Sequence, residues 1–151
     1  MSFIHKLLAT SNSWPLLIAR LTLGVVMFPH GAQKALGIWG GNGFAGTMQG
    51  MSEGLGIPAF LVFLVILAEF GGSLALILGA LSRVAALGIG ITMVVAMTMH
   101  LKNGFFMNWY GKQAGEGFEY HLLAIGLALV VIIGGSGAFS IDRMFSKKKK
   151  A

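Results

Sequence analysis

The chain has 151 residues, of which 56% are hydrophobic and only 11% are charged, and its mean hydropathy is +0.80. A soluble domain carries about a quarter of its residues as charged side chains, so this composition excludes one and indicates an integral membrane protein. At about 20 residues for each crossing, four membrane helices use nearly the whole length. We therefore expect one all-α transmembrane domain over residues 1–151, without a separate soluble domain.

The net charge and the absence of cysteine limit which partners and cofactors this chain can bind. The net charge is +6, but four of the eleven basic residues form the terminal run Lys147 to Lys150, which follows a hydrophobic segment. Such a run suits anionic lipid headgroups, so we expect membrane lipids and no nucleic acid as partners. The sequence contains no cysteine, which excludes thiol relays and thiolate-bound iron–sulfur clusters within this chain.

Four apolar stretches predict a bundle of four membrane helices. They span about residues 14–36, 58–81, 84–101 and 118–139, and a basic tail follows at 140–151. Only Ser82 and Arg83 separate the second helix from the third. A connection this short forces the two helices into an antiparallel hairpin.

The positions of Lys and Arg predict the orientation. The basic residues divide into two groups, one at each end of the predicted bundle: Lys6, Arg83, Arg143 and the terminal lysines against Lys34, Lys102 and Lys112. Because cytoplasmic loops are enriched in Lys and Arg, we expect both termini in the cytoplasm. The outer side then carries two glycine- and aromatic-rich loops, residues 37–57 and 102–117. Residues 44–55 of the first loop predict a short helix at the membrane interface.

One face of the first helix combines small and basic residues. At about 100° per residue, five side chains fall within about 40° of one line along this helix. They are Arg20, Gly24, Met27, Gly31 and Lys34. Small residues allow helices to approach closely in lipid, and charged residues avoid lipid, so we expect this stripe to face the bundle interior.

Two ionisable residues lie deep within the predicted helices. Glu69 is near the middle of the second helix, about 16 Å from either end, too deep for its short side chain to reach water. It must be protonated or paired, and Arg20 of the first helix can extend towards it. Two interpretations stay open: a structural ion pair that fixes the register of the helices, or a proton or quinone site.

A second polar group gathers at the predicted outer rim. The candidates for ligand binding there are His30, Lys34, His100, Glu119 and His121. Such side chains can protonate a quinone headgroup, bind a small anion or hold a metal ion. Glu119 and His121 are two residues apart, about 200° around a helix, so both cannot point into the bundle unless the helix begins between them.

Methionine and histidine in the first and third helices offer a weak metal or haem site. Its members are Met27, His30, Met97 and His100. A methionine stripe serves more often for packing, and neither spacing is a specific motif. We therefore expect neither haem nor a metal ion, and a quinone is the cofactor that the rim suits best.

Several groups of residues along the chain form a recognisable combination. They are Arg20-Leu-Thr-Leu-Gly24, His30-Gly-Ala-Gln-Lys34, Leu55-Gly-Ile-Pro58, Glu69-Phe-Gly-Gly72 with Gly79 and Arg83, Glu119-Tyr120, Gly135-Ser-Gly137 and Ser140-Ile-Asp142. Together they resemble the DoxX family of small four-helix membrane proteins. The resemblance covers most of the chain, and the recurring positions of the family match Arg20, Gly24, Lys34, Glu69, Arg83, Glu119 and Asp142.

The resemblance implies a bacterial inner-membrane protein with a redox-linked association. The family includes relatives of the membrane subunit of thiosulfate:quinone oxidoreductase. Its mycobacterial members are associated with a membrane oxidoreductase complex that contains superoxide dismutase and a sulfurtransferase. Because this chain has no cysteine, a partner would have to supply any thiol.

These features support three functional hypotheses. The leading one is a small redox-linked subunit that offers a quinone-sized site near the outer rim, catalytic only as part of a larger oxidoreductase complex. The first alternative is a non-catalytic anchor or assembly subunit. The second is a small-solute or proton pathway with Glu69 as its carrier. Glycine-rich helix faces also lead us to expect a homo-oligomer or a larger membrane redox complex.

Overall fold

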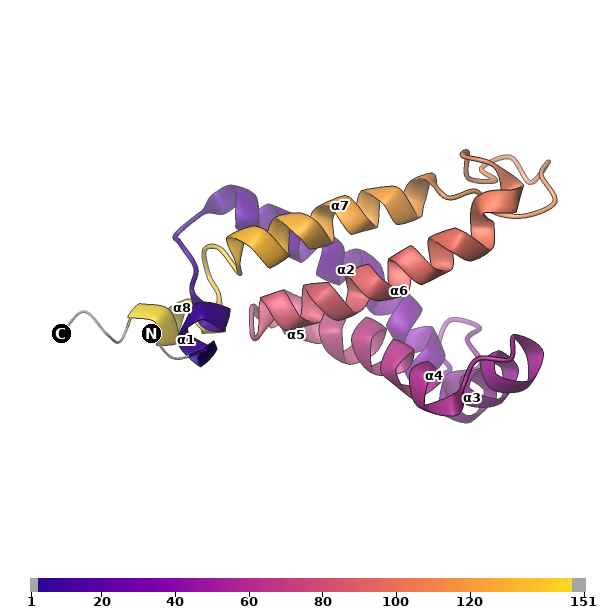
Figure 1. Cartoon of the computed structure of the whole chain (residues 1–151), viewed down its shortest axis with the longest axis horizontal. Coiled ribbons are helices and arrows are strands. Elements are labelled where there is room, and N and C mark those ends of the chain that lie inside the picture. The colour runs from indigo at the N-terminus through magenta and orange to yellow at the C-terminus, as the bar shows by residue number, and fades with distance from the viewer. Residues whose placement is uncertain (1–2, 148–151) are drawn as a thin grey trace.

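The computed structural model describes residues 3–147, which form helices joined by turns and contain no strand (Figure 1). In chain order the elements are α1 (Phe3–Leu8), α2 (Trp14–Leu36), α3 (Gly43–Gly54), α4 (Ala59–Ile66), the π-helical turn η1 (Leu67–Gly71), α5 (Gly72–Leu78), α6 (Ser82–His100), the 3-10 turn η2 (Leu101–Asn103), α7 (Glu119–Gly134) and α8 (Ile141–Lys147). The predicted tail beyond Lys147 lies outside the described residues.

The two ends of the bundle differ in what they carry (Figure 1). The short helices α1 and α8 pack together at one end, called here the terminal end. The opposite end, called here the loop end, carries α3 and the connection of residues 104–118. The short helix predicted in the first loop is confirmed as α3.

Three helices are long and apolar enough to cross a membrane: Trp14–Leu36, Ala59–Leu78 and Ser82–Asn103. The fourth apolar helix, α7, has 16 residues. These residues cover about 24 Å at 1.5 Å per residue, less than the hydrocarbon thickness of about 30 Å. The all-helical membrane fold is thus confirmed, while the fourth crossing and the cytoplasmic position of the termini stay predictions.

The turn between α5 and α6 lies earlier in the chain than predicted. The second helix ends at Leu78 rather than at residue 81, because Gly79 adopts a left-handed conformation with φ 71°. Ser82 and Arg83 were expected to form the connection but belong to the first turn of α6. The carboxylate of Asp142 stabilises this start, since it accepts hydrogen bonds from the backbone N–H groups of Leu81 (2.7 Å) and Ser82 (3.0 Å).

The last long helix is shorter than the predicted stretch of residues 118–139. It ends at Gly134, because Gly135 and Gly137 both adopt positive φ angles that a right-handed helix excludes. The following segment folds back onto the start of α2, where the Ala138 N–H donates to the Ser13 carbonyl at 3.0 Å. This return segment, residues 135–140, lies at the terminal end of the bundle.

The core lies between α2, α5, α6 and α7 and consists largely of small and medium-sized apolar side chains. Its most deeply buried members, all at most 1% exposed, are Leu23, Met27, Leu76, Ala86, Ile89, Ala128 and Val131. The stripe predicted on the first helix faces this interior, as Arg20, Gly24, Met27 and Gly31 are buried and Lys34 is partly buried. That prediction is confirmed.

The outer faces of the long helices carry exposed apolar side chains. Ile18 in α2, Phe60 in α4, Ile91 in α6 and Leu123 in α7 are each more than half exposed. In water such a surface would associate non-specifically, whereas in a bilayer it faces acyl chains of the same polarity. The distribution of apolar side chains therefore fits lipid as the surrounding medium.

Candidate functional site

Arg20 does not pair with Glu69. Its side chain is fully buried and donates five hydrogen bonds to backbone carbonyls. Nε reaches Ser136 (2.8 Å), Nη1 reaches Leu76 and Ile77 (2.9 Å to the second), and Nη2 reaches Ala138 (3.2 Å) and Phe139 (3.1 Å). All five N–H donors of the guanidinium are thus used. The predicted Arg20–Glu69 ion pair is wrong, and Arg20 instead joins the end of α5 to the return segment.

Arg20 and Glu69 do not pair because they lie at different heights along the bundle. Arg20 lies level with the carbonyl of Leu76, and Leu76 is seven residues beyond Glu69, about 10 Å along the helix axis. Because the last carbonyls of a helix have no partner within it, an arginine at this level stabilises them directly.

Arg83 and Asp142 complete the polar network of the terminal end. Arg83 donates to the carbonyls of Ile132 and Ile133 at the end of α7, the second at 2.8 Å, and to that of Ala9 at 3.1 Å. Asp142 is 2% exposed and also accepts a hydrogen bond from the Ser136 hydroxyl. These residues hold helix ends together, and we assign them to the stability of the fold rather than to ligand binding.

Glu69 is paired with Lys34. The Lys34 Nζ lies 2.6 Å from the Glu69 Oε2, and the exposed fractions of the two side chains are 29% for the lysine and 4% for the glutamate. Lys34, which we expected at the outer rim, thus pairs with Glu69, which we expected in the core. The pair links the last turn of α2 to the middle of the second membrane helix, so the glutamate side chain is buried while the lysine side chain is partly exposed.

The backbone around this ion pair is unusual. Glu69 lies within η1, a single π-helical turn between α4 and α5. Such turns are rare and occur often at functional sites. A Cβ on Gly31 of α2 would lie 2.5 Å from the backbone of Glu69 and Phe70, so only glycine allows α2 to approach η1 this closely. On the other side, the Thr47 hydroxyl of α3 donates to the Lys34 carbonyl at 3.2 Å.

His30 and Tyr120 lie beside the ion pair. Their rings are 6.0 Å apart, and His30 lies about one helical turn before Lys34 along α2. The Tyr120 hydroxyl donates to the Met27 sulfur at 3.3 Å. We call His30, Lys34, Glu69 and Tyr120 the rim cluster; it joins α2, η1 and α7. Tyr120 was not among the predicted site residues, because its place beside α2 depends on how α7 packs.

The other two predicted histidines form a stacked pair. The rings of His100 and His121 are 4.9 Å apart, at 27° to one another, and His121 is 7% exposed. Tyr120 connects this pair to the rim cluster, since its ring is 5.7 Å from that of His121. Four rings thus form a continuous series from α2 through α7 to α6, in the order His30, Tyr120, His121 and His100.

Glu119 points away from this series. Its Oε1 accepts hydrogen bonds from the Met107 N–H (3.0 Å) and from the Trp109 Nε1 (2.9 Å). The two side chains expected to diverge do so, with His121 buried and Glu119 holding the loop of residues 104–118. Glu119 therefore stabilises the loop end and does not join the rim cluster.

The structure does not assemble the weak metal site. The sulfur of Met27 is occupied by the Tyr120 hydroxyl. Within residues 3–147, no three His, Asp or Glu side chains converge in an arrangement that can hold a metal ion. His30 and His100 belong to the ring series instead, where Tyr120 and His121 lie between them.

Comparison with known proteins places the chain in a family. The DoxX family model matches residues 15–102, which include Arg20, Lys34 and Glu69. The inner membrane protein YqjF of Escherichia coli K12 is 37% identical over 133 residues, covering 87% of this chain and 92% of that protein. An uncharacterized protein of Haemophilus influenzae is 32% identical over 134 residues, covering 85% and 89% of the two chains. No solved structure matches. The chain therefore belongs to the DoxX family and is a multi-pass protein of the inner membrane.

Proposed function

We propose that this protein is a redox-linked membrane subunit that binds the headgroup of a quinone at the rim cluster. The observation that carries the proposal is the Lys34–Glu69 ion pair, held by a π-helical turn next to His30 and Tyr120. Ionisable groups within membrane helices are costly and are usually retained for function. Here Lys34 and Glu69, both within membrane helices, form an ion pair.

The chemistry of these side chains suits a quinone. A quinone headgroup presents two carbonyl oxygens, which accept hydrogen bonds, and its reduction consumes two protons and two electrons. The Lys34 ammonium and the Tyr120 hydroxyl are donors, and His30 and Glu69 can exchange protons. Lys34 is partly exposed, so a ligand can reach it while the carboxylate stays buried. We assign the electron donor to a partner subunit.

The alternative for this ion pair is a purely structural role, in which it only holds α2 against the second membrane helix. Replacing a buried ion pair by apolar residues is often neutral for stability, so stability alone does not distinguish the two roles. Ligand retention does, because a structural pair has no effect on quinone other than through folding.

The test measures quinone bound to protein that is solubilised gently from its native membrane, by organic-solvent extraction and mass spectrometry. We expect Lys34→Met to lower the bound quinone at least tenfold, while Lys34→Arg, which keeps the charge, retains more. The matched control is Lys102→Met, because Lys102 is an exposed lysine at the same end of the bundle.

A second readout does not depend on the yield of folded protein. A photoreactive quinone should label the peptide that contains His30 and Lys34, or the one that contains Tyr120. Wild-type protein without quinone, or Lys34→Met with wild-type quinone content, would contradict the proposal. If a larger protein copurifies instead, the anchor or assembly function becomes the better hypothesis.

A further inference from the structure

The terminal end contains an open groove that the rim cluster does not use. It has a volume of about 410 Å³ and lies where the end of α5 meets α8 and the residues before it. Its lining residues are Leu78, Phe139, Ser140, Ile141, Arg143 and Met144. Three of these apolar side chains, Leu78, Phe139 and Met144, are more than half exposed, so the groove is an apolar surface with one cation at its edge.

Arg143 is the cation of this groove. Among the three arginines of the described part of the chain, Arg20 and Arg83 donate to backbone carbonyls, and only the guanidinium of Arg143 has no hydrogen bond. The neighbouring Asp142 does not neutralise it, because that carboxylate is buried against the start of α6. The charge of Arg143 is therefore available to a ligand.

Aromatic residues indicate at which level of the membrane the groove lies. Trp14 and Phe139 form an edge-to-face pair with ring centroids 5.5 Å apart, and both are more than half exposed. Exposed tryptophan is enriched where the acyl chains of a membrane meet the headgroups. Because Phe139 also lines the groove, we expect its apolar wall at the level of the upper acyl chains and Arg143 near the level of the phosphates.

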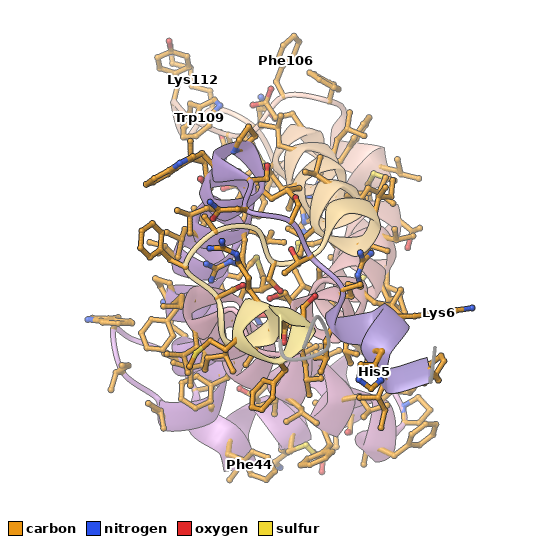
Figure 2. The ribbon with its side chains drawn as sticks, turned by 90° about the vertical axis from the view of Figure 1, so that its left-hand side faces the viewer. His5, Lys6, Phe44, Phe106, Trp109 and Lys112 are labelled. Carbon is orange, nitrogen blue, oxygen red and sulfur yellow. The ribbon has the colours of Figure 1, made fainter. Side chains whose placement is uncertain are left out.

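We propose that this groove binds one anionic phospholipid of the adjacent leaflet, with Arg143 at the phosphate and the apolar wall against the first part of an acyl chain. Charge complementarity favours an anionic lipid, because Arg143 is the one charged residue among the six that line the groove. Lys6 does not contribute to this site, since it extends away from α8 when the molecule is viewed from the terminal end (Figure 2). The proposal is independent of quinone binding.

The experiment is native mass spectrometry of the full chain in an equimolar mixture of dioleoylphosphatidylglycerol and dioleoylphosphatidylcholine. The two lipids share acyl chains and differ in headgroup charge. We expect wild-type protein to retain one phosphatidylglycerol in preference to phosphatidylcholine. Arg143→Gln should lower this preference about fivefold, the effect of one cation near an anionic surface, and Arg143→Lys should keep most of it.

Two controls make the result specific. Lys102→Gln removes one exposed positive charge at the loop end and should leave the preference unchanged. Replacing Lys147 to Lys150 by glutamine tests the tail, and the preference should largely survive. An Arg143→Gln protein that is folded by circular dichroism and keeps the wild-type preference would overturn the proposal. A preference that disappears only with the tail lysines would overturn it as well.

Discussion

Replacing Gly31 by alanine tests the contact that brings α2 against the π-helical turn. The backbone atoms of Glu69 and Phe70 occupy the space where a Cβ would lie, 2.5 Å away. Backbone atoms cannot move aside as the end of a flexible side chain can. Alanine at this position must therefore push α2 and η1 apart.

The size of the effect follows from this distance. An ordinary contact of a Cβ is 3.4–4 Å, so the two helices must separate by about 1 Å to restore van der Waals contact. Overpacking of this kind lowers the free energy of unfolding by about 1–3 kcal/mol. Lys34 lies one helical turn beyond Gly31, so the same shift should lengthen its 2.6 Å ion pair with Glu69 and reduce the amount of bound quinone.

The assay is thermal unfolding of the purified protein in detergent, followed by circular dichroism. Gly126→Ala is the matched control, because Gly126 is an exposed residue of α7 with no atom within 4 Å of the added Cβ. We expect the control to unfold at or slightly above the wild-type midpoint, since alanine favours a helix over glycine by roughly 0.5–1 kcal/mol. Equal midpoints for the two variants would refute the close contact.

Three further substitutions test the polar contacts. Arg20→Lys leaves three N–H donors for five carbonyls. Because each buried unsatisfied carbonyl costs about 1–3 kcal/mol, we expect the free energy of unfolding to fall by at least about 2 kcal/mol. An unchanged midpoint of thermal unfolding would contradict this. Lys34→Glu places two carboxylates together and should lower the free energy of unfolding by about 3–5 kcal/mol. Adding Glu69→Lys should restore at least half of this loss, a recovery that would not occur if the ion pair were absent. Glu119→Ala should raise amide hydrogen exchange at Met107 at least tenfold, since a hydrogen bond to a carboxylate contributes about 1.5–3 kcal/mol. Unchanged exchange would count against this role of Glu119.

The membrane helices and their inward face were predictable because both depend on local spacing. A membrane helix needs a long apolar stretch, and the stripe from Arg20 to Lys34 follows from the 3.6-residue period alone. The ends of the helices were less predictable. Gly79 and Gly135 end helices by adopting positive φ angles, but the many other glycines of this chain gave no means of choosing between them.

The partners of the buried charges could not be obtained from spacing. Arg20 is satisfied by backbone carbonyls, and since every residue carries a carbonyl, no residue type in the sequence marks its partners. The Lys34–Glu69 pair joins two residues 35 positions apart. Choosing Lys34 rather than Arg20 for Glu69 required the height at which α2 crosses the second helix, which the contact at Gly31 determines.

The bonds of Arg20 have a consequence for synthesis at the ribosome. Three of its five acceptors belong to Ser136, Ala138 and Phe139, the first of which lies 116 residues further along the chain. While the protein is being made, the first membrane helix therefore enters the bilayer with a guanidinium whose final partners do not yet exist. The bundle reaches its native state only when the last segment is released, because a chain truncated before residue 136 would leave three N–H donors of this buried guanidinium without their acceptors.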